Sequence, residues 1–175
     1  MARERDIKTV TERNIEALRR RPRLARSTAR TTVSLRRGGT ACEIEDGPWK
    51  LLADLGSDQG GGGAAPDPGV LGRGALGACM VIGYEVWAAR LGVRIDDVRV
   101  TVESDFDATG MYGIDDDISP GWQAVRCTIE IASPDAAERV ASMVEQANRH
   151  SPLLADISRP VSVTCDVRIT APLKE

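Results

Sequence analysis

The sequence predicts an α+β fold in which a buried central helix packs on mostly antiparallel sheets. The expected elements are two strands, a long apolar helix, two strands, a second helix and a last strand, an order that favours antiparallel pairing over a doubly wound sheet. At 175 residues the chain suits one domain, which we place at residues 26–175, after a helical arm at residues 1–25. Hydrophobic residues make up 42% and charged residues 28%, as in folded globular proteins.

Two features of the sequence bear on where the protein resides. No apolar run reaches the roughly 18 residues of a membrane-spanning helix, so we expect no contact with a membrane. The first residues are charged and lack the apolar stretch of a secretory signal, which predicts a cytoplasmic protein. In that compartment the four cysteines are expected to be thiols rather than disulfides.

The N-terminal arm is a basic amphipathic segment. Ile7, Val10, Ile15 and Leu18 fall on one side of a helix that Pro22 ends. Residues 1–37 carry a net charge of +8, whereas the remainder carries −11. Such an arm could bind nucleic acid, or it could lie against the acidic body of its own chain or of a partner subunit. We favour the second interpretation because the arm has no aromatic side chain on which a base could stack.

A hairpin and a glycine tract follow the arm. The segments Ala29–Leu35 and Thr40–Glu45 are predicted strands, joined by a turn at Arg36-Arg37-Gly38-Gly39. After Trp49–Leu55 the chain reaches Gly60–Gly63. This tract lacks the Gly-Lys-Ser/Thr ending of a phosphate-binding loop, so we expect a mobile loop rather than a nucleotide site.

The central helix carries most of the fold prediction. Asp67 and Pro68 form a typical helix start, with Asp as N-cap and Pro in the first position. The helix runs over Val70–Leu91, and its middle, Ala75–Gly83, is apolar on every side. A helix without a polar face is expected to be buried all round, here by a sheet and by a second subunit. Its glycines each cost about 1 kcal/mol relative to alanine, which close approach of another helix would offset.

The C-terminal half continues the pattern. We expect, in order, a strand at Val98–Glu103, an acidic loop at Asp105–Ser119, a strand at Val125–Ile131, a helix capped by Ser133-Pro134 and broken at His150-Ser151-Pro152, a short turn, and a last strand at Val161–Ile169. The acidic residues Asp115–Asp117 lack the glycine and closing glutamate of a calcium-binding EF loop. We therefore expect a solvated loop, no bound metal and no cofactor.

Four cysteines and one histidine are the candidate chemical groups. Cys42, Cys127 and Cys165 are each expected on the apolar face of a strand, and no C-x-x-C pattern supports zinc or dithiol chemistry. Cys79 lies among small residues of the central helix, where a reactive role would need a nearby cation. His150 is expected to cap the end of its helix; its neighbour Ser151 does not make a catalytic pair with it, because adjacency in sequence does not set that geometry.

Four of these motifs together resemble the OsmC/Ohr family of osmotically induced and organic-hydroperoxide-resistance proteins. They are Gly60–Gly63, Ala65-Pro66-Asp67-Pro68, Leu76-Gly77-Ala78-Cys79 and His150-Ser151-Pro152, in that order. The resemblance extends from about residue 28 to residue 169 and leaves the arm outside. It implies an intertwined homodimer in which two central helices pack together between sheets and two active sites lie at the subunit interface.

The resemblance also implies roles for particular residues. Cys79 matches the cysteine whose thiolate attacks the peroxide and becomes a sulfenic acid. Arg36 and Arg37 are candidates for the arginine that stabilises this thiolate. Ser151 stands where the family has its second, resolving cysteine, and Gly69 stands where a glutamate usually holds the arginine.

Two functions remain open at this point. The first is a one-cysteine hydroperoxide reductase that depends on an external thiol as reductant, since Ser151 cannot form a disulfide with Cys79. The second is a catalytically degenerate protein that binds a small apolar or electrophilic ligand in the interface cavity, with Met80 and Trp87 as apolar walls.

Overall fold

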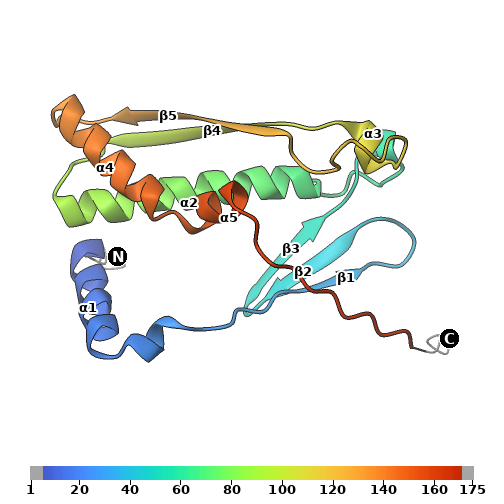
Figure 1. Ribbon diagram of the computed structural model, residues 1–175, viewed down its shortest axis with the longest axis horizontal. Coiled ribbons are helices and arrows are strands. Elements are labelled where there is room, and N and C mark those ends of the chain that lie inside the picture. The colour runs from blue at the N-terminus through green and yellow to red at the C-terminus, as the bar shows by residue number, and fades with distance from the viewer. Residues whose placement is uncertain (1–5, 171–175) are drawn as a thin grey trace.

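The computed structural model describes residues 6–170 and shows a mixed fold of helices and antiparallel sheets, which confirms the predicted fold class (Figure 1). Its elements are α1 (Ile7–Arg20), η1 (Pro22–Ala25), β1 (Thr32–Leu35), β2 (Cys42–Asp46), β3 (Trp49–Ala53), η2 (Ser57–Gln59), α2 (Pro68–Leu91), β4 (Asp97–Asp105), α3 (Ala108–Met111), β5 (Ala124–Ala132), α4 (Ala137–Arg149) and α5 (Pro152–Ser158). No helix within residues 6–170 is both long and apolar enough to cross a membrane.

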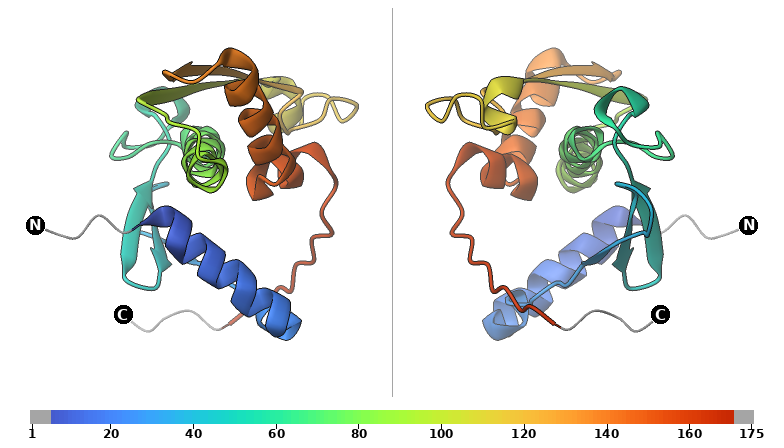
Figure 2. Two further views of the ribbon diagram at one scale, coloured as in Figure 1. Left: turned by 90° about the vertical axis from the view of Figure 1, so that its left-hand side faces the viewer. Right: turned by 90° about the vertical axis from the view of Figure 1, so that its right-hand side faces the viewer.

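The strands form two separate sheets. One has the order β1-β2-β3 and the other pairs β4 with β5, and every pairing is antiparallel. Helices α2 and α4 lie beneath the β4–β5 sheet, and the β1–β3 sheet lies on the far side of α2 (Figures 1 and 2). The sequence predicts the first two strands but assigns no strand to Trp49–Leu55, where the structure has β3.

The core lies between α2, α4 and the β4–β5 sheet. Leu76, Met80 and Tyr84 of α2 meet Met143 and Ala147 of α4, and the inward-facing side chains of β4 and β5 cover them. The Tyr84 hydroxyl donates a hydrogen bond of 2.8 Å to the side-chain oxygen of Asn148. Burial raises the pKa of Tyr84. This contact joins α2 to α4, the helix that leads to residues 150 and 151.

The central helix begins as predicted but is not buried on every side. The Asp67 carboxylate accepts a hydrogen bond of 2.8 Å from the Val70 amide, and Pro68 occupies the first turn. One face of α2 is open to solvent in the single chain: Ile82 is 63% exposed, and Val70 and Ala78 are exposed as well. Nothing within residues 6–170 covers that face, so its predicted burial by a second subunit stays a prediction.

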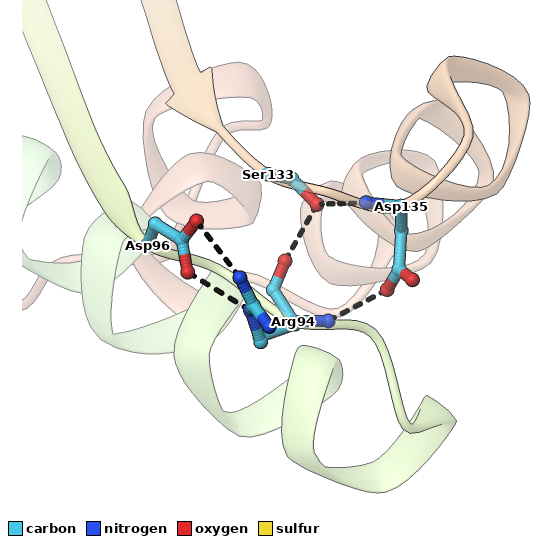
Figure 3. Close-up of polar contacts among 4 residues, drawn as sticks. All are labelled: Arg94, Asp96, Ser133 and Asp135. Atoms are coloured by element: carbon cyan, nitrogen blue, oxygen red, sulfur yellow. Dashed lines mark hydrogen bonds and ion pairs between the residues drawn. The ribbon is translucent and has the colours of Figure 1, made fainter.

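A polar cluster joins the loops at one end of the core (Figure 3). The Arg94 guanidinium pairs with Asp96, and the Arg94 amide donates to the Asp135 carboxylate at 2.8 Å. The Ser133 hydroxyl donates to the Arg94 carbonyl at 2.6 Å and accepts from the Asp135 amide. The sequence predicts Ser133 as a cap of α4, and this prediction is wrong, because the N-cap is Ala136. Instead, Ser133 fixes the start of α4 against the end of α2.

The predicted last strand is wrong for the described chain. Residues 160–170 follow α5 without any strand, and they run away from the β4–β5 sheet (Figures 1 and 2). Their apolar side chains are exposed, up to 95% for Ile169, and Cys165 is exposed instead of lying on a buried face. The alternation of apolar and polar residues is present, but a strand also needs a neighbour to supply hydrogen bonds, and none within residues 6–170 does so.

Candidate functional site

Cys79 and Ser151 lie together, although 72 positions separate them in the chain. The Cys79 sulfur is 3.5 Å from the Ser151 hydroxyl oxygen. Cys79 comes from the middle of α2 and is partly exposed, whereas Ser151 precedes α5 and is 6% exposed. Ser151 occupies the N-cap position of α5 but makes no side-chain capping bond, so its hydroxyl is directed to the sulfur instead.

The Ser151 hydroxyl can stabilise a negative charge on the Cys79 sulfur. The thiol is a weak hydrogen-bond donor, and the hydroxyl is both donor and acceptor. Once the thiol has lost its proton, the hydroxyl can donate to the thiolate and stabilise its charge, as hydrogen bonds to the charged form do. A partly exposed sulfur beside a hydroxyl is a site where a small electrophile can be attacked.

His150 lies beside this pair but serves a different contact. It is the C-cap of α4, as the sequence predicts, and its Nδ1 is 2.8 Å from the Gln146 carbonyl oxygen. Because a carbonyl oxygen only accepts, Nδ1 carries a proton. The imidazole ring packs on Trp87, with ring centroids 4.9 Å apart, and the Arg90 guanidinium lies 3.9 Å from the centroid of the same indole. His150 and Trp87 therefore form part of the α2–α4 packing.

Neither candidate arginine is linked to Cys79 by a hydrogen bond or an ion pair in the described chain. The Arg36 guanidinium is 3.7 Å from the Glu43 carboxylate across the β1–β2 hairpin. Arg37 lies in the turn and is exposed. Both lie in the connection between β1 and β2, and the β1–β3 sheet lies on the far side of α2 from the β4–β5 sheet (Figure 2). Their role at the sulfur remains a prediction.

Asp54 is a buried carboxylate that the sequence analysis does not single out. It directly follows β3, is 3% exposed, and accepts hydrogen bonds from the Thr40 hydroxyl and from backbone amides of the glycine tract. The hydroxyl of Thr40 and these amides hold the pKa of Asp54 below its usual value. The position of this aspartate, between the apolar end of a strand and a run of glycines, is the sequence feature that could have indicated its role, because glycine amides are common partners of carboxylates.

The other cysteines have no such neighbours. Cys42 and Cys127 are half-buried on β2 and β5, as predicted, and burial raises the pKa of the Cys127 thiol. No group of three or more His, Cys, Asp or Glu residues within residues 6–170 is arranged to hold a metal ion. Cys79 is thus the cysteine whose sulfur contacts a polar side chain of another element.

Comparison with known proteins identifies relatives of this fold. The model of the OsmC-like protein family matches residues 60–166. An OsmC-like protein from Mycoplasma pneumoniae superposes with a TM-score of 0.64 at 13% identity, covering 75% of this chain and 88% of its own. The organic hydroperoxide resistance protein OsmC from Legionella pneumophila gives a TM-score of 0.56 at 22% identity, covering 75% and 89%.

A third structure shows a bound ligand. It is a Vibrio cholerae protein with captopril in one of its active sites, and it gives a TM-score of 0.52 at 18% identity, covering 75% of this chain and 86% of its own. No curated protein matches the chain by sequence. At these identities the structural likenesses establish the fold, and the family model establishes the family.

Proposed function

This chain belongs to the OsmC-like protein family, and we propose that it is a thiol-dependent organic hydroperoxide reductase that acts through one cysteine, Cys79. The observation that carries the proposal is the contact of 3.5 Å between the Cys79 sulfur and the Ser151 hydroxyl. The relative from Legionella pneumophila, which is named an organic hydroperoxide resistance protein, supports the substrate class.

The reaction balances with two equivalents of an external thiol. The Cys79 thiolate attacks the terminal oxygen of the hydroperoxide, the O–O bond breaks, and the alkoxide takes a proton and leaves as an alcohol. The sulfur has then lost two electrons and is a sulfenic acid. One external thiol displaces water to form a mixed disulfide with Cys79. A second attacks that disulfide, releasing the Cys79 thiol and a disulfide of the two external thiols.

Ser151 stabilises the thiolate in the first step, but it cannot attack the sulfenic acid in place of the first external thiol. Its hydroxyl donates to the thiolate at the position where a resolving cysteine would attack the sulfenic acid. A hydroxyl forms no S–S bond, so the oxidised sulfur must wait for a thiol from solution. Either Arg36 or Arg37 would complete the site by placing a guanidinium beside the sulfur, which favours the thiolate.

We further propose that the site is completed in a homodimer, because three apolar surfaces of the single chain lack cover. The first is one face of the β1–β3 sheet, where Val33, Leu35 and Leu51 are exposed. The second is the open face of α2, with Ile82. The third is the extended segment of residues 160–170. Contiguous exposed apolar area of this kind is characteristic of protein interfaces, which supports the proposal that a second copy of the chain covers all three.

The geometry of α2 favours an antiparallel pairing of the two central helices. On its open face, the space beside Gly74 is empty, and Ile82 projects two turns further along. A two-fold axis passing near Ala78 would seat Ile82 of each chain over the partner's Gly74, whereas a parallel pair would place two bulky side chains against each other. Close approach at glycine would offset the helix-destabilising cost of that residue.

The experiment that tests the function is consumption of cumene hydroperoxide with dithiothreitol or dihydrolipoamide as reductant. Wild type is expected to consume peroxide, and Cys79→Ser is expected to abolish turnover, because the nucleophile is lost. Ser151→Ala is expected to slow the reaction without abolishing it. Equal rates for wild type and Cys79→Ser would overturn the proposal and leave ligand binding as the function of this fold.

A gain-of-function variant provides a second test. In Ser151→Cys the new thiol replaces a hydroxyl that is already 3.5 Å from the sulfur of Cys79. One equivalent of hydroperoxide should then produce an intrachain disulfide, visible by intact mass spectrometry as a loss of two hydrogens. Wild type should instead show an addition of one oxygen. If Ser151→Cys also showed only an addition of one oxygen, position 151 would not reach the oxidised sulfur, and the contact that carries the proposal would be overturned.

A further inference from the structure

The glycine tract and Asp54 form one hydrogen-bonded unit, and the proposed thiol chemistry gives no role to either. Each carboxylate oxygen of Asp54 accepts two hydrogen bonds. Oδ1 accepts from the Thr40 hydroxyl at 2.6 Å and from the Leu55 amide at 2.9 Å. Oδ2 accepts from the amides of Gly62 at 3.2 Å and Ala64 at 3.0 Å. A carboxylate so fully satisfied is stable in its charged form although its residue is buried.

The tract must be glycine for this arrangement to form. Gly60 and Gly63 have φ values of +84° and +62°, which side chains disfavour. A Cβ on Gly61 would lie 2.1 Å from the Leu55 carbonyl oxygen, and one on Gly62 would lie 3.1 Å from Asp54 Oδ2. The sequence predicts a mobile loop here, but the structure anchors the tract by hydrogen bonds to the residues that follow β3.

Asp54 connects three segments of the chain. Through Thr40 it holds the β1–β2 turn, which the Arg36 amide closes with a hydrogen bond of 2.8 Å to the Ala41 carbonyl. Through Gly62 and Ala64 it holds the tract. Through its own amide, which donates to the Pro66 carbonyl at 3.2 Å, it holds the residues just before α2. The turn that bears Arg36 and Arg37 is thereby fixed relative to the start of the helix that carries Cys79.

We infer that Asp54 is a positioning residue that presents the arginine turn for the chemistry at Cys79. This inference rests on the proposed function, since it assigns a purpose to a turn whose arginines serve the sulfur. Asp54 acts on the turn itself, through Thr40, and not on a guanidinium.

Thr40→Val is the variant that tests the inference. It removes one hydroxyl and keeps the size of the side chain, and Thr31→Val is a matched control. Thr31, which directly precedes β1, donates to Asp46 of β2 at the same 2.6 Å, away from the arginine turn. Alkylation of Cys79 by iodoacetamide, measured by peptide mass spectrometry across pH, reports how well the thiolate is stabilised without needing a peroxide.

We expect Thr40→Val to slow alkylation several-fold at neutral pH and to move the midpoint of the pH profile upward. Thr40→Ser should restore the wild-type profile, and Thr31→Val should leave it unchanged. Arg36→Gln or Arg37→Gln should have the same effect as Thr40→Val. Combining Thr40→Val with the effective arginine variant should add little, because both act on one interaction.

The outcomes separate this inference from the proposed function. A wild-type profile in Thr40→Val, with a displaced profile in an arginine variant, would overturn the inference and leave the proposed function standing. A displaced profile in Thr40→Val with no effect of either arginine variant would also overturn it, since Asp54 would not act through the turn. Loss of turnover in Cys79→Ser, measured separately, decides the function itself.

Discussion

Two parts of the molecule both contain periodic apolar side chains, but the single chain buries these side chains in only one of the two parts. In the first part, α2, α4 and the β4–β5 sheet enclose a core that includes Leu76, Tyr84 and Met143. In the second, the arm, the β1–β3 sheet and residues 160–170 leave apolar side chains in solvent, as at Leu35, which is 71% exposed. Nothing within residues 6–170 covers these apolar side chains of the second part, and we propose that a second copy of the chain does so.

Truncation of one leucine in each part gives the largest expected difference. Leu76→Ala removes a fully buried side chain and should cost about 2–5 kcal/mol of unfolding free energy at any protein concentration. Leu35→Ala should instead lower stability in a way that depends on protein concentration, because its cover would come from a partner. Urea unfolding at two concentrations, about a hundredfold apart, measures both. A Leu35→Ala variant as stable as wild type at both concentrations would remove the β1–β3 face from the interface.

A charge on the open face of α2 should separate the subunits. Ile82→Arg places a guanidinium where we propose contact with the partner's Gly74, and burial of an unpaired charge should raise the dimer dissociation constant at least about tenfold. Thr101→Arg, on the exposed outer face of β4, adds the same side chain away from that helix and serves as the control. Sedimentation velocity over a concentration series distinguishes them; identical behaviour of the two variants would contradict the antiparallel helix pair.

Removal of the Tyr84 hydroxyl should have a smaller effect on stability than the leucine truncations have. Tyr84→Phe removes the hydrogen bond to Asn148 and leaves a side-chain oxygen without its partner, at a cost of about 1–2 kcal/mol. Tyr112→Phe alters an exposed tyrosine and should be neutral. Because the contact lies inside the covered part, its loss should be the same at every protein concentration, as thermal unfolding at two concentrations would check.

The parts of the fold that short-range patterns determine are well predicted by the sequence. Pro22 follows α1 and η1 begins there, while Asp67 and Pro68 start α2, because caps and prolines act within a few residues. The proximity of Cys79 and Ser151 could not be predicted from such short-range patterns. Periodicity alone left both residues unremarkable, and only the resemblance of their motifs to a family indicated that they share a site.

The failures have a common physical cause. The strand predicted at residues 161–169 has the right alternation, but a strand exists only with a partner. Ser133 looked like a helix cap and instead joins two loops (Figure 3). No local pattern indicates the role of Asp54, because its partners, Thr40 and the glycine tract, meet it only in the folded chain. In each case the deciding contact is remote in sequence.

Loss of a surface ion pair on the β4–β5 sheet should have the smallest effect on stability, and that effect should depend on pH. Arg126 holds Asp105 through two hydrogen bonds of 2.5 and 2.8 Å, which keep the pKa of Asp105 below its usual value. A lowered carboxyl pKa stabilises the fold above the unfolded value, near 4, and that contribution disappears as the pH falls through the lower, folded value. Asp105→Asn should therefore be slightly less stable than wild type at pH 7, and the difference in thermal unfolding should vanish as the pH falls through the lowered pKa of Asp105. A difference that stayed constant through this fall in pH would show that the pair contributes through packing and not through its charge.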